Sequence, residues 1–344
     1  MAGTACPPLR FSNAPREVTN LAYIGAAFAH TMSDETISLG RIAAFLESNA
    51  AVAEKAAIHR VYAPAEALAG NIPVGDDCAA IPDGDGFLLF AAEGMLEAFV
   101  ATDPWFAGYC VVMVNLSDVA AMGGRPLAIV DVIWTPAMEH TAEIWEGLSA
   151  ASRAYGVPVV GGHTTLTRGG PTHLAAAVLG RARKLITSFY AQPGDDLLMA
   201  VDLRGAFHKG KPYWNASIGA PPERLRADLE LLPTLAERGW RVAGKDISNG
   251  GIVGTLAMLL ECSRVGAELW VDHLPRPAEA SLEQWLITFP SYGYLLSVAP
   301  EHTDETIAHF AHRELACARV GQITASPGLS LSYGAARQAL ALAR

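Results

Sequence analysis

Residues 115–126 have the sequence NLSDVAAMGGRP, and they carry the strongest structural signal in this chain. They close a largely apolar stretch over residues 104–122, which predicts a helix that ends at a Gly-Gly pair. On such a helix Asn115 and Asp118 lie on the same face. Asp118 is therefore a carboxylate in apolar surroundings, with no Lys or Arg within one turn. Burial of a carboxylate is costly unless a cation or a hydrogen-bond donor meets it.

More carboxylates precede this helix in the chain. Asp76 and Asp77 come just before a predicted strand over residues 77–82, and Glu93 ends the apolar run 87–92. The sequence DGDG between the two runs predicts a hairpin turn, which would bring the carboxylates close together. Each has a simpler alternative, because an Asp pair often caps a turn and Glu93 could reach solvent. Together they predict a shared site for Mg²⁺, which takes oxygen ligands and often shares them with phosphates.

Two other motifs follow predicted strands. The sequence GGHTT at residues 161–165 comes after the strand 157–160, and its N–H groups and hydroxyls would contact phosphate unless it is a plain turn. His163 would donate to phosphate, carry a proton or simply pack. The sequence KDISNGG at residues 245–251 opens a predicted helix, where Asp246 would act as a cap or as part of a ligand site.

Composition limits the classes of function. The 344 residues carry a net charge of −10 and no basic stripe, which argues against nucleic acid as a partner. Length favours two domains. Five scattered cysteines without a CxxC pair indicate neither a disulfide framework nor a zinc site, and they favour a reducing cytoplasm. Residues 1–20 are polar and have no apolar signal-peptide region. The apolar stretch 21–32 is too short to span a membrane.

The order of predicted elements divides the chain into two similar halves. We expect an N-terminal arm over residues 1–36, a domain over 37–185 and a second domain over 190–344, in an α+β layered architecture. The expected helices span residues 38–53, 104–122, 141–155, 223–238, 249–265, 281–288 and 304–315. The expected strands after the first hairpin span residues 127–134, 157–160, 174–183, 196–203, 267–271, 292–298 and 318–323, and the apolar run 127–134 predicts burial on both faces.

These motifs, in this order, resemble those of the superfamily of AIR synthase, selenophosphate synthetase, thiamine-monophosphate kinase, formylglycinamidine synthase and a hydrogenase maturation factor. The resemblance covers residues 38–325. Residues 75–80 resemble the GDDAA motif, and residues 115–126 are similar to the helix signature NxSDxxAMGxxP. Residues 161–164 resemble the phosphate loop of selenophosphate synthetase, and residues 246–251 resemble the DxSDGG segment of formylglycinamidine synthase.

The resemblance implies an AIR synthase-like fold of two α/β domains, and a homodimer whose N-terminal strands join into a β-barrel. It implies ATP bound with Mg²⁺ near the dimer contact. The implied metal ligands are Asp76, Asp77 and Asp246, to which the hairpin argument adds Glu93. The implied nucleotide contacts are Asn115, Asp118, Gly161, Gly162, His163 and Thr164, and the candidate catalytic residues are Asp76, Asp118 and His163.

Some family features are replaced. Glu93 stands where the family has Asp, and Cys6 lacks the Gly-rich surroundings of the selenophosphate synthetase nucleophile. From the predicted metal site and the shared motifs, we expect an ATP- and Mg²⁺-dependent enzyme that transfers a phosphoryl group to a small-molecule acceptor. The alternative is a nucleotide-binding partner or regulatory subunit of the same fold that has no turnover. Neither nucleic acid nor a membrane is an expected partner.

Overall fold

The computed structural model describes residues 38–55 and 72–342, all within one compact unit that starts at Ser38. The predicted arm over residues 1–36 lies outside the described residues. Within them, no helix is long and apolar enough to cross a membrane. The described cysteines, none of them in a disulfide, are Cys78, Cys110, Cys262 and Cys317.

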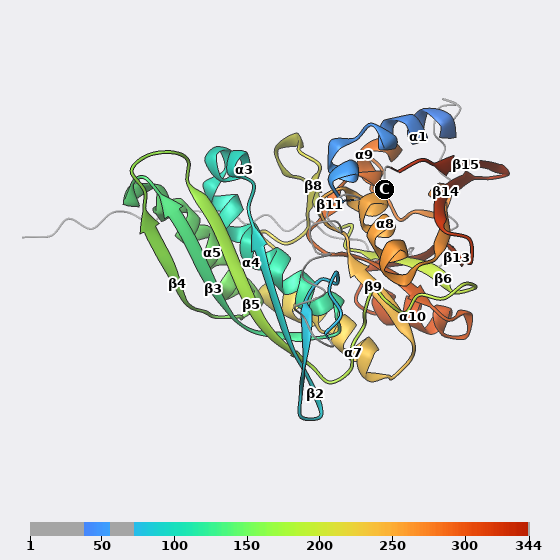
Figure 1. Cartoon of the computed structure of the whole chain (residues 1–344), viewed down its shortest axis with the longest axis horizontal. Helices are drawn as coiled ribbons and strands as arrows, with labels where there is room; N and C mark the ends of the chain where they lie inside the picture. The colour runs from blue at the N-terminus through green and yellow to red at the C-terminus, as the bar shows by residue number, and fades with distance from the viewer. Residues whose placement is uncertain (1–37, 56–71, 343–344) are drawn as a thin grey trace, which may run out of the picture. The chain divides into compact units, whose positions relative to one another are not determined.

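The first half forms a five-stranded sheet in the order β1-β2-β5-β3-β4, with helices on one face (Figure 1). Strands β1 and β2 form the predicted hairpin, whose turn contains Gly84 at φ +62°. Strand β3 pairs antiparallel with β5 and parallel with β4. The elements are β1 (Ala79–Asp83), β2 (Gly86–Gly94), α3 (Glu97–Thr102), α4 (Pro104–Ala121), β3 (Arg125–Thr135), η1 (Met138–Thr141), α5 (Ala142–Tyr155), β4 (Val159–Leu166) and β5 (His173–Ala182).

Only one face of this sheet is buried. In β3, Ile129 and Ile133 are fully buried against the helices, whereas Val130 on the other face is 40% exposed. Within the single chain, the predicted strand over residues 127–134 is therefore buried on one face only. We call the second face the outer apolar face, and its exposed large side chains are Phe90, Leu127, Val130, Trp134, Val160 and Leu179.

Helix α4 begins and ends as predicted. Pro104 stands in its first turn, where a missing N–H costs nothing, and Gly123 adopts φ +73° just after its end. The helix packs closely on α5 because two glycines, Gly108 and Gly147, let the two backbones approach. A Cβ on either glycine would collide with a carbonyl oxygen of the opposite helix. This contact fixes the helix that carries Asp118.

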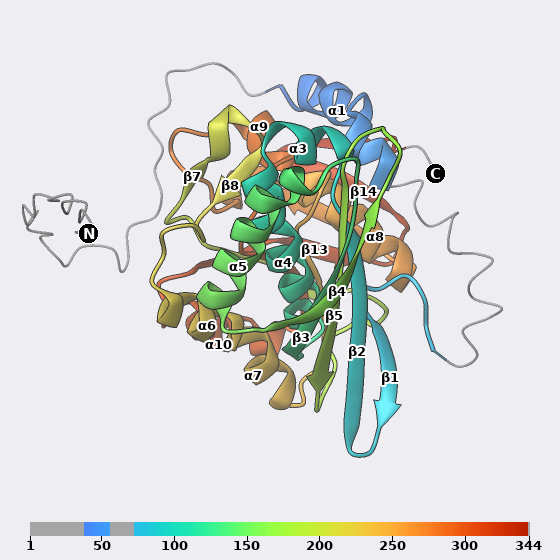
Figure 2. The same ribbon diagram turned by 90° about the vertical axis from the view of Figure 1, so that its left-hand side faces the viewer.

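The second half contains a seven-stranded mixed sheet in the order β15-β14-β10-β13-β6-β12-β9, and a three-stranded sheet in the order β11-β8-β7 (Figure 2). The strands are β6 (Asp196–Val201), β7 (Ala206–Phe207), β8 (Tyr213–Asn215), β9 (Val242–Asp246), β10 (Gly266–Trp270), β11 (Phe289–Pro290), β12 (Gly293–Val298), β13 (Ala316–Thr324), β14 (Gly328–Tyr333) and β15 (Ala336–Leu340). The helices are α6 (Pro222–Leu229), α7 (Leu231–Glu237), α8 (Gly251–Ser263), α9 (Leu282–Leu286) and α10 (Thr303–Ala311).

Several expectations for this half need correction. The single helix expected over residues 223–238 is divided into α6 and α7 at Glu230. The sequence also missed the final hairpin β14–β15, whose strands pair antiparallel from Leu329 with Leu340 to Tyr333 with Ala336.

Helix α1 (Leu39–Glu47) packs on the second half of the chain rather than on the first (Figure 1). It contacts β14, β15 and α9. Arg41 forms an ion pair of 2.9 Å with Glu283, and Glu47 accepts a hydrogen bond of 2.7 Å from the N–H of Ala341. The first helix of the expected domain 37–185 thus packs on the C-terminal sheet, where the apolar face of α1 is buried, and the domain boundaries stay a prediction.

The close contact of α4 and α5 gives a prediction. Gly147→Ala would place a methyl group against the carbonyl oxygen of Trp105, so we expect the free energy of unfolding to fall by about 2 kcal/mol. Urea denaturation measures this change. The matched control is Gly40→Ala in α1, where a Cβ comes no nearer than 4.0 Å to Ser38 Oγ, and which should stabilise slightly. Equal stability of Gly147→Ala and wild type would contradict the packing argument.

Candidate functional site

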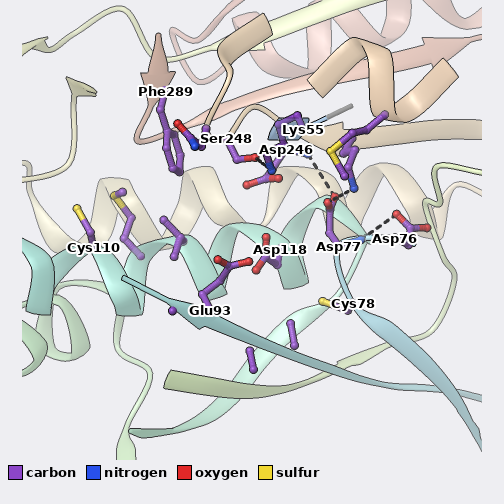
Figure 3. A pocket seen from close by; sticks show the side chains of 18 of the residues that line it. Lys55, Asp76, Asp77, Cys78, Glu93, Cys110, Asp118, Asp246, Ser248 and Phe289 are labelled. Atoms are coloured by element: carbon purple, nitrogen blue, oxygen red, sulfur yellow. Dashed lines mark hydrogen bonds and ion pairs between the residues drawn. The ribbon is translucent and has the colours of Figure 1, made fainter. Parts of the chain in front are cut away.

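A cavity of about 710 Å³ lies between the two halves of the chain. Its described lining comes from residues 72–79, the end of β2, helices α3 and α4, strands β8, β9 and β11, helix α8, and Lys55. One part of the wall is rich in carboxylates (Figure 3), and another is lined by aromatic side chains.

Three carboxylates from distant parts of the chain converge in this cavity. Asp77 precedes β1, Asp118 lies on α4, and Asp246 ends β9, yet one oxygen of each lies within 4.8 Å of the other two. We call these three residues the carboxylate triad. The structure thus brings together three residues that the sequence singled out. The predicted roles, metal ligand for Asp77 and Asp246 and nucleotide contact for Asp118, stay predictions.

Asp118 is the member of the triad that most needs a cation. Its side chain is 5% exposed, and among the described residues its Oδ2 has no hydrogen-bond partner. Burial raises the pKa of Asp118 well above its ordinary value, and the charges of Asp246 and Glu93 raise it further. An unpaired buried oxygen beside two other carboxylates suits a hard divalent cation such as Mg²⁺. The residues present therefore fit the ion that the sequence predicted.

Asp76 was predicted to be a metal ligand and a catalytic residue, but its carboxylate is engaged elsewhere. Its two oxygens accept hydrogen bonds from the N–H (2.9 Å) and the Oγ (2.6 Å) of Ser188, in the segment between β5 and β6. Asp76 and Asp77 are adjacent in non-helical backbone, so their side chains point in different directions. Asp77 joins the triad, and Asp76 anchors the segment that contains Ser188.

Glu93 lies beside Asp118 on the cavity wall, outside the triad (Figure 3). Burial raises its pKa, and the nearby Lys55 opposes that rise. Lys55 donates a hydrogen bond of 2.9 Å to Ser248 Oγ. Glu93 is therefore placed to reach a ligand in the cavity together with the triad.

Lys245 is the residue that sequence reasoning missed. Its ammonium group forms an ion pair with Asp77 Oδ1, and its side chain is 4% exposed. Burial alone would lower the pKa of Lys245, but Asp77 and Asp76 hold it above its ordinary value. The chain has five lysines, and two of them, Lys55 and Lys245, line this cavity. The scarcity of lysine, together with the position of Lys245 directly before Asp246, was the available signal.

Asn115 does not face the cavity, although the sequence predicted a nucleotide contact. It is fully buried, and its Nδ2 donates to the carbonyl oxygens of Val111 (2.7 Å) and Ala176 (3.4 Å). Residues three apart on a helix share a broad face, but here β5 covers the part of that face that contains Asn115. Of these two residues, only Asp118, one turn further along α4, lines the cavity.

The predicted phosphate loop is a strand. Residues 161–164 continue β4 beside β3, from Gly161 opposite Val130 to Thr164 opposite Ile133. Strand β4 is at the edge of the sheet, and Gly161, Gly162, His163 and Thr164 do not line the cavity in the described chain. The sequence predicts a loop here and a strand is found, because the backbone of these glycines pairs with β3; their contact with phosphate stays a prediction.

The aromatic part of the cavity combines rings from both halves of the chain. Phe99 of α3 lies 5.5 Å from Phe106 of α4 and 5.6 Å from Tyr213 of β8, measured between ring centroids. Phe289 of β11 lines the same region (Figure 3). Among the described lining residues, the charged side chains all belong to the segments 55, 76–77, 93, 118, 245–246 and 261. The aromatic part therefore suits an apolar, planar group.

Two family models match most of the chain. Residues 75–182 match the AIR synthase related protein, N-terminal domain, and residues 204–334 match the corresponding C-terminal domain. The chain belongs to the AIR synthase related family. The two-domain α/β fold expected from the sequence is thereby confirmed. In the described residues both large sheets are open, and the chain by itself forms no closed barrel.

Named relatives extend the comparison. The chain is 47% identical over 268 residues to "Uncharacterized protein sll0787" of Synechocystis, covering 78% of this chain and 83% of that protein. It is 28% identical over 302 residues to thiamine-monophosphate kinase of Synechococcus elongatus, covering 78% and 89% of the two chains.

Solved structures resemble the fold. One, described as AaThiL complexed with AMPPCP and TMP, has a TM-score of 0.62 at 18% identity and covers 80% of this chain and 91% of that chain. Another, Thermotoga maritima PurL complexed with ATP, has a TM-score of 0.65 at 20% identity. It covers 77% of this chain, which spans only 46% of the PurL chain.

The buried carboxylates predict a pH dependence of stability. Burial raises the pKa of Asp76 to about 6 and that of Asp246 to about 7, above the unfolded value of about 4. The folded chain therefore binds protons more tightly than the unfolded chain. Its stability without metal should fall as pH rises from about 4 to about 7.

Denaturant titrations at pH 5 and pH 8 test this prediction, with and without saturating Mg²⁺. The ion should reduce the difference because it replaces protons as the partner of the carboxylates. Asp246→Asn should reduce the difference as well. Stability that rises with pH in the metal-free protein would contradict the assignment.

Proposed function

We propose that this protein is an ATP- and Mg²⁺-dependent enzyme that transfers a phosphoryl group to a small molecule. The observation that carries the proposal is the carboxylate triad, with an unpaired oxygen on Asp118, in a cavity large enough for small-molecule ligands. Carboxylate oxygens that hold Mg²⁺ against phosphates are a recurrent feature of phosphoryl transfer.

The chain's own groups would divide the work. Asp118 and Asp246, beside Asp77, would hold the ion, which when bound would neutralise charge on the transferred phosphoryl group. Lys55 and Lys245 would hold anionic oxygens in place, because both line the cavity and Lys245 pairs with Asp77 (Lys55 is labelled in Figure 3). Positioning and charge neutralisation supply most of the catalysis that this reaction needs.

The named relatives support the nucleotide part of the proposal. They include a thiamine-monophosphate kinase and a selenide, water dikinase, and the similar solved structures include PurL complexed with ATP. The aromatic part of the cavity supports an acceptor that carries a planar ring, since Phe99, Tyr213 and Phe289 offer stacking surfaces. We therefore propose a ring-bearing alcohol or phosphate as the acceptor.

The alternative is a subunit of the same fold that binds nucleotide without turnover. The substitution of Glu for the family Asp at position 93 and the placement of His163 away from the cavity favour it. The two proposals differ in one measurable quantity, which is the release or transfer of phosphate.

The test is ATP consumption with Mg²⁺ across a panel of heteroaromatic methanols and of aliphatic alcohols of similar size. We expect consumption to depend on a ring-bearing acceptor and to fall by about 100-fold in Asp118→Asn, which removes a charge from the triad. Asp85→Asn, in the exposed β1–β2 turn, is the control. Nucleotide binding with no consumption for any acceptor favours the regulatory alternative. Unchanged nucleotide affinity of Asp118→Asn in Mg²⁺ would show that the site is misplaced.

We also propose that the protein acts as a homodimer in which the outer apolar faces of two five-stranded sheets meet. Six large apolar side chains are exposed there on neighbouring strands, which is unusual for a surface in contact with water. The meeting of two such faces could close the sheets into the barrel that the family resemblance implies. It would also bring β4, with Gly161, Gly162, His163 and Thr164, near the second chain.

Size-exclusion chromatography with light scattering tests the dimer. Val130→Asp, in the middle of the outer apolar face, should give a monomer, because a buried unpaired carboxylate would destabilise the interface. Met138→Asp is the control, because Met138 is 53% exposed but lies in η1, outside this face. A monomeric wild type, or a dimer that Val130→Asp leaves intact, would contradict the proposal.

A further inference from the structure

One carboxylate of the cavity, that of Asp77, is paired with a buried lysine. The ammonium of Lys245 is bonded to Asp77 Oδ1, and the two side chains are 4% and 5% exposed. Lys245 lies in β9, a strand buried along its whole length. The cation is thus a fixed part of the protein.

The hydrogen bonds of Asp77 leave little room for a separate metal ion on its Lys245 side. Its Oδ1 bonds Lys245, and its Oδ2 accepts a bond of 3.3 Å from the N–H of Asp246. Asp118 Oδ2, by contrast, has no partner among the described residues. Free ligand capacity is therefore concentrated at Asp118 and on the side of the triad away from Lys245.

The charges that line the cavity also favour a single bound divalent ion. Five carboxylates and two ammonium groups line the carboxylate part of the described wall: Asp76, Asp77, Glu93, Asp118, Asp246, Lys55 and Lys245. The sixth carboxylate of the lining, Glu261, is exposed to solvent and left out of this count. One divalent ion would offset most of the remaining negative charge. Without Lys245, Asp77 would be a buried carboxylate with no cation, and a second ion would be needed to stabilise it.

We propose that Lys245 is a built-in cation that takes the place of a second divalent ion. The ammonium group of Lys245 fixes Asp77 and directs its remaining N–H groups at the anionic end of the ligand. The triad then binds a single divalent ion, on Asp118 and Asp246. The proposal rests on the proposed function for the anionic ligand. It adds a positioning residue for that ligand and a metal stoichiometry, neither of which follows from the family fold.

The experiment counts Mn²⁺ ions bound to the full-length protein by electron paramagnetic resonance, with Mn²⁺ alone as the probe. Wild type should bind one ion per chain, and Asp118→Asn should weaken this binding at least about tenfold. Lys245→Met should bind a second ion, because Asp77 becomes a free ligand. Lys245→Arg should still bind one. Lys184→Met removes an exposed lysine outside the cavity and serves as the charge-matched control.

The double variant Lys245→Met/Asp77→Asn removes both charges of the pair and guards against misfolding of the single variant. It should bind one ion, as wild type does. Two ions in wild type, or one ion in a folded Lys245→Met variant, would overturn the inference and leave the proposed function intact. No bound ion in wild type would instead overturn the magnesium requirement of the proposed function itself. Wild-type counting alone can therefore refute the inference, even if Lys245→Met does not fold.

Discussion

Electrostatic repulsion among buried carboxylates is the constraint on which the candidate site depends. One carboxylate oxygen of each of Asp77, Asp118 and Asp246 lies within 4.8 Å of the other two, and the three side chains are buried. Such an arrangement is unfavourable in the empty protein, and only the surrounding fold can hold it together. Lys245 offsets one of these charges. A divalent ion would offset the remaining negative charge and could bind a phosphate group at the same time.

Helix α4 connects this constraint to the rest of the fold. It packs on the five-stranded sheet on one side and, through Gly108 and Gly147, on α5 on another. Both contacts depend on side chains far from the cavity. They hold Asp118 at a fixed position while strand β9 brings Lys245 and Asp246 from the second half of the chain. A site assembled from two halves in this way gains rigidity from each sheet and leaves a cavity between them for ligands.

The sequence predicted the parts of this arrangement that local chemistry determines. The helix around Asp118 and the β1–β2 hairpin follow from Gly, Pro and Asp-Gly positions, and a carboxylate amid apolar residues indicated a cation site. Side-chain direction was harder to predict. Neighbouring Asp76 and Asp77 look equivalent in sequence, but only Asp77 faces the triad. Similarly, the run that contains Val130 does not show which face the helices cover, because its one charged residue, Asp131, lies on the buried face and the exposed face carries Val130 and Trp134.

The central claim is that Asp118 and Asp246 together hold a divalent ion against the phosphates of a nucleotide. Anomalous X-ray diffraction from crystals of the protein grown with Mn²⁺ and a non-hydrolysable ATP analogue tests it most directly. The account predicts an anomalous peak at about 2 Å from oxygens of both residues and of the phosphates. A nucleotide bound away from this cavity, or an ion that contacts neither residue, would contradict it.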